Sequence, residues 1–599
     1  MNRVDSRRER PPTGELSCRC IAGSADVMHS TAVFLNVRMQ NCANAQNKPK
    51  SGDHPTGAEA CQMSLVTSST EHKGSSHRHP SLSHRPPDDV TATMASLPPF
   101  EHTPHETIVA TTSRVRASFL THTTRPLEYR LVQLRKLYWG LKDNADLVVE
   151  ACRRDLGKPS FETYLTELSW CMNDIVFMTK NLARFAKDET PEDMAFTNRL
   201  FGPRIRKDPM GTALIIGAYN FPIQLSIGPL IGAIAAGCTA VLKPSESSPC
   251  AAAVMQKIIE ESLDPACYAC VQGAIPETTA LLDQKWDKIF YTGSAGVGTI
   301  IAKKAAETLT PVTLELGGRN PAIITKHADP RLAARRLLWA KTLNAGQVCV
   351  SQNFTMIDTD MVQPFLREMK AALEEFYPNG ARQSPDYGRI VNQRQFQRLK
   401  KMLDDSDGKI MLGGTMDEAD LFIEPTVVQV TSTSDSLIVD ESFGPLLPIL
   451  VVRDLDEAIK IANDVHDTPL GLYPFGTKPE MEKVLSQTRS GGASLNDGFF
   501  HASIPTMPFG GVGSSGSGAY RGKASFDVFT HRRSVTTTPA WIEGMLDVRY
   551  PPYTAAKKKK MSAMNDLKPN FDREGKVIGW GPWLFGLLGF KSLAAVVGK

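Results

Sequence analysis

At 599 residues the chain is too long for one ordinary domain and has room for roughly three or four. Hydrophobic residues make up 41% and charged residues 22%; no repeat period or set of long apolar runs appears, which argues against collagen, a coiled coil, a repeat array and a polytopic membrane protein. The net charge of +4 argues against a nucleic-acid partner, and 11 scattered cysteines favour a reducing, intracellular compartment over a disulfide framework.

The first part of the chain differs in composition from the rest. Residues 1–105 are rich in Ser, Thr, His, Pro and Asn, with too few apolar side chains to compensate for the entropy of ordering. We therefore predict a disordered extension, whose basic start lacks the apolar run of a signal peptide. Met94 is an alternative start of the chain. No metal site is expected, because the histidines here lack the Cys/His spacing of a zinc site; they are His77, His79 and His84.

Apolar residues at helical spacing follow this extension. Residues 116–154 and 164–186 carry apolar side chains three and four positions apart, with Arg, Lys and Glu between them. One such set is Val132, Leu134, Leu137 and Leu141. The basic stretch 200–208, which holds Pro203, is expected to form an excursion or hairpin outside the core.

Short apolar runs then alternate with helical segments over residues 211–318. The alternation predicts parallel βαβ units and hence an α/β fold with an open sheet. The expected strands are 212–217, 239–243, 268–272, 288–291 and 312–316. The expected helices are 225–236, 248–263, 278–284 and 299–308. A second α/β run is expected over 321–526. Cys267 and Cys270 are expected to be core residues, because side chains three apart on a strand face opposite sides.

A glycine-rich turn follows the fourth expected strand. It consists of Gly293, Ser294, Ala295, Gly296, Val297 and Gly298. Backbone N–H groups in such a turn, at the start of a helix, can hold phosphate oxygens with the help of the helix dipole. The pattern is not G-x-G-x-x-G, nor is it a P-loop, because Thr299 stands where that motif needs Lys. The alternative is a turn whose glycines only allow close packing.

Three side chains carry the groups that covalent catalysis needs. Glu315 ends one predicted strand, Asn220 follows another, and Cys349 lies in the glycine-bearing stretch 344–349. A thiol, a carboxylate and an amide can serve as nucleophile, base and oxyanion donor in acyl chemistry. The alternatives are an inert buried cysteine and a carboxylate that only makes a salt bridge.

Seven short motifs occur in an order that resembles one known family. They are Asn220-Phe-Pro, Lys243-Pro-Ser-Glu246, Thr292-Gly-Ser, Glu315-Leu-Gly-Gly, Gly346-Gln-Val-Cys349, Glu441-Ser-Phe-Gly-Pro445 and Pro508-Phe-Gly-Gly511. Over about 107–540 the chain resembles the NAD(P)-dependent aldehyde dehydrogenase superfamily. Its ending over 508–533 and its apolar tail are most similar to the class 3, or fatty aldehyde, branch. Arg319 and Tyr291 depart from the residues usual in the motifs but touch none of the three candidate groups.

The resemblance implies a role for each of the three groups. Cys349 would attack the aldehyde carbon as a thiolate, forming a thiohemiacetal and then a thioester. The side-chain amide of Asn220 and the backbone N–H of Cys349 would hold the oxyanion, and Glu315 would activate the water that releases the acid. Lys341 is similar to a lysine found in class 3 active sites, and its role stays open.

The resemblance also implies an NAD site. Lys243 and Glu246 would contact the adenosine ribose, and the turn 293–298 would face the pyrophosphate. Glu441 would bind the nicotinamide ribose, with Phe443 against the ring. The carboxylate of Glu246 favours NAD because it would repel a 2′-phosphate, although class 3 enzymes also accept NADP.

The implied architecture is a Rossmann-like NAD-binding domain over 106–317, with a bridging hairpin at about 188–208, and an α/β catalytic domain over 318–524. Residues 525–545 would form an oligomerisation segment in a homodimer. Residues 546–599 would form a basic linker and an apolar tail.

The composition of the C-terminal tail indicates association with a membrane. Residues 577–590 contain no charge and include the aromatic residues Trp580, Trp583, Phe585 and Phe590, and they come after the lysine run 557–560, which suits anionic lipid heads. We expect the tail to attach the protein to the cytosolic face of an organelle such as the endoplasmic reticulum. The alternative is a helix that covers a partner subunit or the substrate entrance.

The expected reaction is oxidation of long-chain or polyene (apocarotenoid) aldehydes to acids. Two alternatives stay open at this point: a CoA-acylating or reductive relative, which needs no deacylating water, and a catalytically dead, membrane-associated scaffold. Glu315 argues against the first, and the joint presence of Cys349, Glu315 and Asn220 argues against the second.

Overall fold

The computed structural model describes most of the chain, namely residues 96–194, 196–577 and 579. The chain divides into two units after Val90, and all of the described residues belong to the second unit. The histidines and the alternative start predicted for the first 95 residues lie outside the described residues, as does nearly all of the apolar tail. The packed part begins earlier than expected, because Leu97 already packs against the core and the Thr103 N–H donates to the Gln272 carbonyl at 3.0 Å.

A six-stranded sheet has the order β16-β6-β5-β2-β3-β4. The strands are β16 (Gly516–Ser517), β6 (Val312–Glu315), β5 (Lys288–Thr292), β2 (Thr212–Ile216), β3 (Thr239–Lys243) and β4 (Tyr268–Cys270). Five of them run parallel, and the short β16 pairs antiparallel with β6. The five strands predicted from the alternation are therefore confirmed, each to within two residues at its ends.

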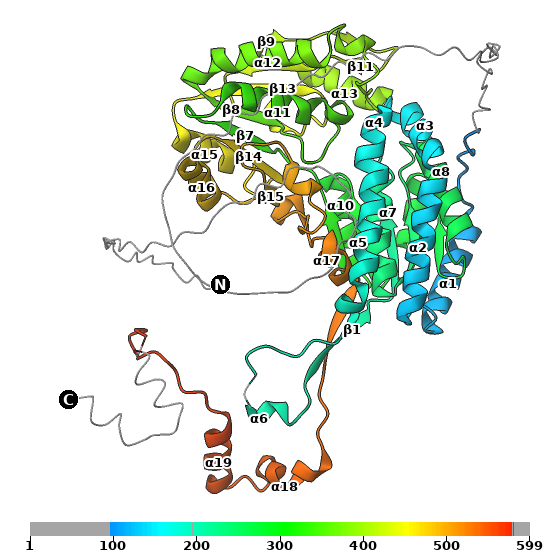
Figure 1. Ribbon diagram of the computed structural model, residues 1–599, viewed down its shortest axis with the longest axis vertical. Helices are drawn as coiled ribbons and strands as arrows, with labels where there is room; N and C mark the ends of the chain where they lie inside the picture. Colours follow the sequence, from blue (N-terminus) through cyan, green and yellow to red (C-terminus); the bar gives the residue numbers. More distant parts are fainter. Residues whose placement is uncertain (1–95, 195, 578, 580–599) are drawn as a thin grey trace, which may run out of the picture. The chain divides into compact units, whose positions relative to one another are not determined.

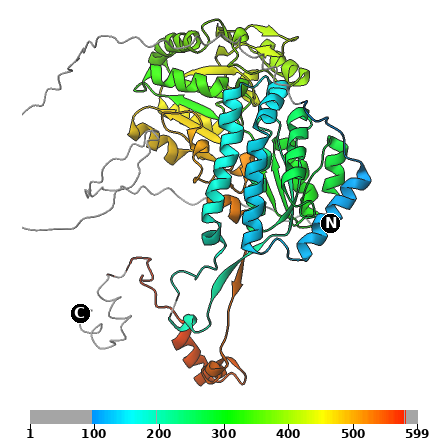
Figure 2. The ribbon, with the colours of Figure 1, turned by 45° about the vertical axis from the view of Figure 1, so that its right-hand side comes forward.

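Helices cover both faces of this sheet, and its central strands β2, β3 and β5 are buried at every position. Along β2, Ala213 and Ile215 face the layer of α2, α5, α7 and α8, whereas Leu214 and Ile216 face α1, α9 and α10. Figures 1 and 2 show the first layer standing beside the green strands. The helices are α1 (His105–Leu120), α2 (Leu127–Asp143), α5 (Ser169–Ala186), α7 (Gln224–Ala236), α8 (Pro249–Ser262), α9 (Ile275–Leu282) and α10 (Ala295–Ala306).

The structure differs from the predicted helical segments at Val132 and at residues 164–168. Leu134, Leu137 and Leu141 are fully buried on α2, but Val132 is 36% exposed and lies off the buried face. The segment predicted as one helix from residue 164 begins with a π-helical turn, η1 (Tyr164–Leu168), between α4 (Ser160–Thr163) and α5. π-Helical turns are rare and occur often at functional sites.

The topology of the sheet creates a crevice. The chain runs from β2 outwards to β3 and β4 and then returns to β5 on the other side of β2. In open α/β sheets, ligands bind beyond the carboxyl ends of the strands where the order reverses in this way. The loops that follow β2 and β5 therefore border the expected ligand site.

A second sheet, of seven strands, has the order β15-β14-β7-β8-β13-β12-β9 and confirms the second α/β run. The strands are β15 (Gly492–Ala493), β14 (Gly471–Phe475), β7 (Pro321–Ile324), β8 (Phe354–Asp358), β13 (Leu446–Val452), β12 (Thr426–Val430) and β9 (Lys409–Leu412). Only β9 is antiparallel to its neighbour. Helix α11 (Pro330–Thr342), which packs against α12 (Val362–Phe376), leads into the loop that carries Cys349.

Two segments far apart in the sequence pair outside these sheets. Strand β1 (Arg204–Pro209) lies in the predicted hairpin, and it pairs antiparallel with β17 (Thr530–Val535), in the segment predicted to mediate oligomerisation. The basic linker forms the exposed helix α19 (Ala555–Asn565) around its lysine run. Within the described residues, no helix combines the length and the hydropathy that a membrane crossing requires.

Helix α7 packs closely against α17 (Gly522–Asp527), and we predict that the stability of the protein depends on this contact. A Cβ on Gly232 would collide with the backbone carbonyl of Ser525, whereas a Cβ on Gly228, one turn earlier, would meet its nearest atom at an ordinary 3.5 Å. We expect Gly232→Ala to destabilise the protein by about 1–3 kcal/mol because the backbone must move. Gly228→Ala should be neutral or stabilising, since alanine is the better helix former. Urea denaturation of both variants checks this, and equal loss in both would contradict it.

Candidate active site

Two cavities meet at Cys349. The larger one has a volume of about 630 Å³ and lies at the carboxyl ends of the parallel strands of the six-stranded sheet. The smaller one has a volume of about 60 Å³ and an almost wholly apolar lining. Cys349 lines both of them, so a group attached to its sulfur can be reached from either side.

The three predicted catalytic side chains all line the larger cavity. Asn220 follows β2, Glu315 is the last residue of β6, and Cys349 follows the 3-10 turn η2 (Leu343–Gly346) after α11. Because β2 and β6 are parallel strands of one sheet, their carboxyl ends open onto the same crevice. The structure thus brings together an amide, a carboxylate and a thiol from positions up to 129 residues apart, from 220 to 349.

Asn220 is buried, and both its side-chain amide and its backbone carbonyl make hydrogen bonds. Its Nδ2 donates to the Gln347 carbonyl at 3.0 Å, two residues before the cysteine. Its backbone carbonyl accepts from Lys158 Nζ at 3.1 Å and from Asn344 Nδ2 at 2.8 Å. A primary amide has two N–H groups, so one donor of Asn220 remains beyond the bond to Gln347.

The loop that leads to Cys349 has an unusual backbone. Asn344, Ala345 and Gly346 all have positive φ, at 50°, 50° and 74°. Two consecutive non-glycine residues in this region are strained, and such strain persists only where the surroundings impose it. Here the Glu162 carboxylate accepts from the Asn344 N–H at 2.8 Å. The contact fixes the loop just before Cys349.

Burial is the main cause of the pKa shifts of Cys349 and Glu315 in the site. Burial raises the pKa of Cys349 to about 12, and the nearby Glu441 and Glu315 add to the shift. Burial also raises the pKa of Glu315 well above its usual range. Neither carboxyl oxygen of Glu315 has a hydrogen-bond partner among the described residues. A carboxyl group with a raised pKa is a stronger base once it has lost its proton, and a positive charge in the cleft would lower both pKa values.

Most of the predicted cofactor residues line the same cavity. They are Lys243, Glu246, Gly293, Ser294, Val297, Glu441 and Phe443. Lys243 ends β3, and its Nζ pairs with Glu246 at 2.8 Å. Ala295, Gly296 and Gly298 are not among the lining residues. Helix α10 begins at Ala295 and not at the predicted Thr299. A Cβ on Gly298 would lie 2.8 Å from Leu316, so this glycine allows close packing, as in the alternative interpretation of the turn.

Exposed apolar side chains form a slot that the sequence did not indicate. Ile275 on α9 is 78% exposed, and Val297 and Ile300 on α10 are 43% and 62% exposed; all three line the larger cavity. Exposed apolar groups at a cavity wall fit a flat aromatic ring. Together with the unpartnered carboxyl of Glu315, the start of α10 and the Lys243 ammonium, the slot makes the cavity a fit for NAD or NADP.

Two arginines on α13 (Gln393–Asp404), Arg394 and Arg398, also line the larger cavity, and no sequence motif indicated them. Arg398 donates to the Glu441 carbonyl at 3.1 Å. Lys341 is buried on α11, where its Nζ donates to the Gln352 carbonyl at 2.9 Å and desolvation lowers its pKa to about 7. These contacts join residues far apart in the chain, so no local pattern could have indicated the arginines.

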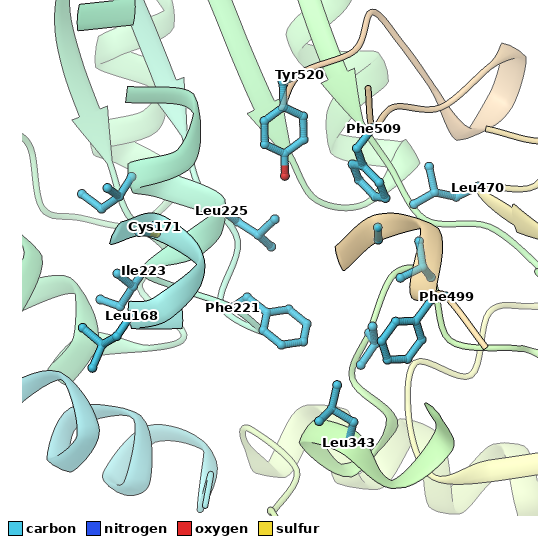
Figure 3. Packing of buried hydrophobic residues seen from close by; sticks show 14 of the residues in the cluster. Leu168, Cys171, Phe221, Ile223, Leu225, Leu343, Leu470, Phe499, Phe509 and Tyr520 are labelled. Atoms are coloured by element: carbon cyan, nitrogen blue, oxygen red, sulfur yellow. The ribbon is translucent and has the colours of Figure 1, made fainter. Parts of the chain in front are cut away.

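Aromatic and aliphatic side chains surround the smaller cavity. Figure 3 shows Phe221 and Leu225 on one side and Phe499 and Leu343 on the other, with Tyr520 closing one end. The lining comes from both halves of the chain, since Phe221 follows β2 and Phe499 lies beyond the seven-stranded sheet. This apolar chamber would accept a hydrocarbon group next to Cys349.

Comparison with known proteins identifies the family. A model of the aldehyde dehydrogenase family matches residues 93–535. A Neurospora crassa protein named beta-apo-4′-carotenal oxygenase is 52% identical over 85% of this chain and 96% of its own, and the mouse dimeric NADP-preferring aldehyde dehydrogenase is 40% identical over 74% and 97%. The substrate-bound structure of Staphylococcus aureus AldH is 38% identical and superposes with a TM-score of 0.73, over 76% of this chain and 99% of that one. The chain therefore belongs to the aldehyde dehydrogenase family of NAD(P)-dependent oxidoreductases.

Proposed function

We propose that this enzyme oxidises long apolar aldehydes, polyene aldehydes above all, to carboxylic acids through a cysteine-bound thioester. The observation that carries the proposal is the position of Cys349 between a polar cleft that fits NAD(P) and an apolar chamber. The Neurospora relative, named for an apocarotenal, supports the polyene class. Saturated fatty aldehydes are the second candidate, because the chamber selects apolar groups and not double bonds.

The chemistry begins with addition of the Cys349 sulfur to the aldehyde carbon. The carbonyl electron pair moves to oxygen, and the resulting oxyanion accepts hydrogen bonds from Asn220 Nδ2 and the Cys349 N–H. One such donor typically contributes about 3–4 kcal/mol to stabilising the transition state. When bound, NAD or NADP supplies the hydride acceptor, and the carbon stays attached to Cys349 as a thioester.

Glu315 then serves as the base for the second half of the reaction. It takes a proton from a water molecule, whose oxygen attacks the thioester carbon, and Cys349 leaves as a thiolate while the acid is released. The apolar chamber, at about 60 Å³, would hold the carbon atoms next to the aldehyde group and keep bulk water from the sulfur. This hydrolytic step separates the proposed function from a CoA-acylating or reductive enzyme.

The proposed cofactor contacts follow the lining of the cleft. Lys243 and Glu246 would hold the adenosine ribose, with the base in the apolar slot. The turn that leads into α10 would face the pyrophosphate through its lining residues Gly293, Ser294 and Val297. Glu441 would bind the nicotinamide ribose, with Phe443 against the ring. We propose a preference for NAD, because the Glu246 carboxylate would repel a 2′-phosphate.

We also propose a homodimer and a membrane attachment. The dimer is supported by the mouse relative, which is named as dimeric, and residues 525–545 would take part in the contact. The attachment is supported by the exposed lysines 558–560 and by the apolar composition of residues 577–590. Localisation to the cytosolic face of an organelle would follow from such a tail.

Replacement of the nucleophile tests the central proposal. Cys349→Ala should abolish NADH formation because no other group can form the thioester, while calorimetric NAD binding persists. The parent enzyme, given polyene, saturated and short aldehydes, should show its highest kcat/KM with the polyenes and should release free acid without CoA. A dependence on CoA, or NADH formation by the alanine variant, would contradict the proposal.

The pH dependence of acid release tests the role of Glu315. Because burial raises the pKa of Glu315, the carboxylate form that acts as a base becomes more populated as the pH rises. We expect thioester hydrolysis in the parent enzyme to speed up with pH, and Glu315→Gln to slow it by about 10²–10⁴-fold and to remove that dependence. Mass spectrometry of the acyl-enzyme across neutral and alkaline pH measures both. An unchanged slope in the variant would exclude Glu315 as the base.

Vesicle flotation tests the membrane attachment. The complete chain should float with vesicles that contain anionic lipid, and a chain that ends before Trp580 should not, while both oxidise a soluble aldehyde equally. Replacing lysines 557–560 by alanine should weaken binding by about 1 kcal/mol per charge at low salt. Flotation of the shortened chain to the same extent would remove the tail from the proposal.

A further inference from the structure

A fully buried ion pair lies behind the active site. Lys158 Nζ and Glu167 Oε1 are 2.6 Å apart, and both side chains have no exposed surface. Taking two charges out of water costs several kcal/mol per ion, so a pair of this kind is weak evidence for a purely stabilising role. Neither residue lines either of the two cavities described above, so the pair cannot touch substrate or cofactor there.

The pair instead holds the turn that carries Asn220. Lys158 Nζ donates to the Asn220 carbonyl at 3.1 Å and lies 4.1 Å from the centre of the Phe221 ring. The second oxygen of Glu167 accepts from the N–H groups of Ile223 and Gln224 at 3.1 and 2.9 Å. The lysine therefore fixes the start of the turn between β2 and α7, and the glutamate fixes its end.

The same stretch of chain also reaches the cysteine loop. Glu162, on α4, accepts from the Asn344 N–H, and Asn344 Nδ2 donates back to the Asn220 carbonyl at 2.8 Å. Glu167 lies on the π-helical turn η1, whose wider winding differs from that of an α-helix and changes the direction in which Glu167 projects. Figure 3 shows Leu168, the next residue, beside Ile223. Residues 158–167 thus contact both loops that supply the oxyanion donors.

We infer that Lys158 and Glu167 are positioning residues that fix the Asn220 amide relative to Cys349, so that its free N–H is aimed at the oxyanion. The inference rests on the proposed role of Asn220 as an oxyanion donor. Donors of this type act only when they are held in place before the charge develops, and a displacement of 1 Å can cost about 10²-fold in rate. The alternative is a pair that contributes to stability alone.

The test uses a variant that removes both charges together. In Lys158→Met/Glu167→Gln no charge is left buried without a partner, and glutamine keeps an oxygen for the two N–H groups of the turn. The melting temperature and NAD affinity should stay close to those of the parent. The single-turnover rate of NADH formation should fall by about 10-fold, because the Asn220 carbonyl loses its charged donor.

Coupling to Asn220 separates positioning from general damage. Asn220→Ala alone should slow the single turnover by about 10²–10³-fold. In that background the Lys158→Met/Glu167→Gln change should cause little further loss, since the group that it positions is already gone. A further loss of the same 10-fold would overturn the inference, and so would a parental rate in the folded double variant. A parental rate in Asn220→Ala would instead refute the proposed function of Asn220.

A matched control and a milder variant complete the experiment. Lys207→Met/Glu189→Gln removes an ion pair of 2.6 Å with an equally buried lysine on β1, and its single-turnover rate should be parental. If the double variant does not fold, Lys158→Arg keeps the charge but replaces the compact ammonium by a planar guanidinium. It should slow the single turnover several-fold in the parent and not in Asn220→Ala; equal slowing in both would overturn the inference.

Discussion

The parallel alignment of β2, β3, β5 and β6 is the constraint on which the site depends. Parallel strands end at a common edge, and the order of the sheet reverses between β2 and β5, so the groups beyond these ends face one crevice. Asn220, Lys243, Ser294 and Glu315 all lie at that edge. A single slip in strand register would turn these side chains to the opposite face of the sheet. The apolar cores on both faces oppose such a slip.

Two different environments meet at the sulfur of Cys349. The larger cavity presents charged and polar groups, whereas the chamber around Phe221 and Phe499 is lined almost wholly by hydrocarbon. Glu315 is buried with no hydrogen-bond partner in the part of the chain that the structure describes, and the Cys349 thiol is buried too, so both groups disfavour charge in the isolated protein. The site therefore suits ligands that bring a positive charge to one side and an apolar chain to the other.

Polar contacts behind the site hold its loops in conformations that they would not adopt alone. Asn344 and Ala345 remain in the left-handed region because Glu162 and the Asn220 turn surround them. The buried pair of Lys158 and Glu167 serves the same turn from the other side. The desolvation of these charges costs free energy, and in return the amide and the thiol keep one relative position.

Local pattern was sufficient for the strands and for most of the helices, because alternation and glycine-bearing turns are encoded over a few residues. It also placed Glu315 at the end of one strand and Asn220 just after another, as the structure has them. It failed at the start of α10, where Ser294 caps the helix four residues earlier than expected. Local pattern could not indicate the roles of Arg398, Glu162 or the ion pair of Lys158 and Glu167. The neighbours of a charged residue in the sequence do not determine which distant residues it will contact in the folded protein. Only the tertiary structure decides that, because burial and partners arise when segments distant along the chain pack together.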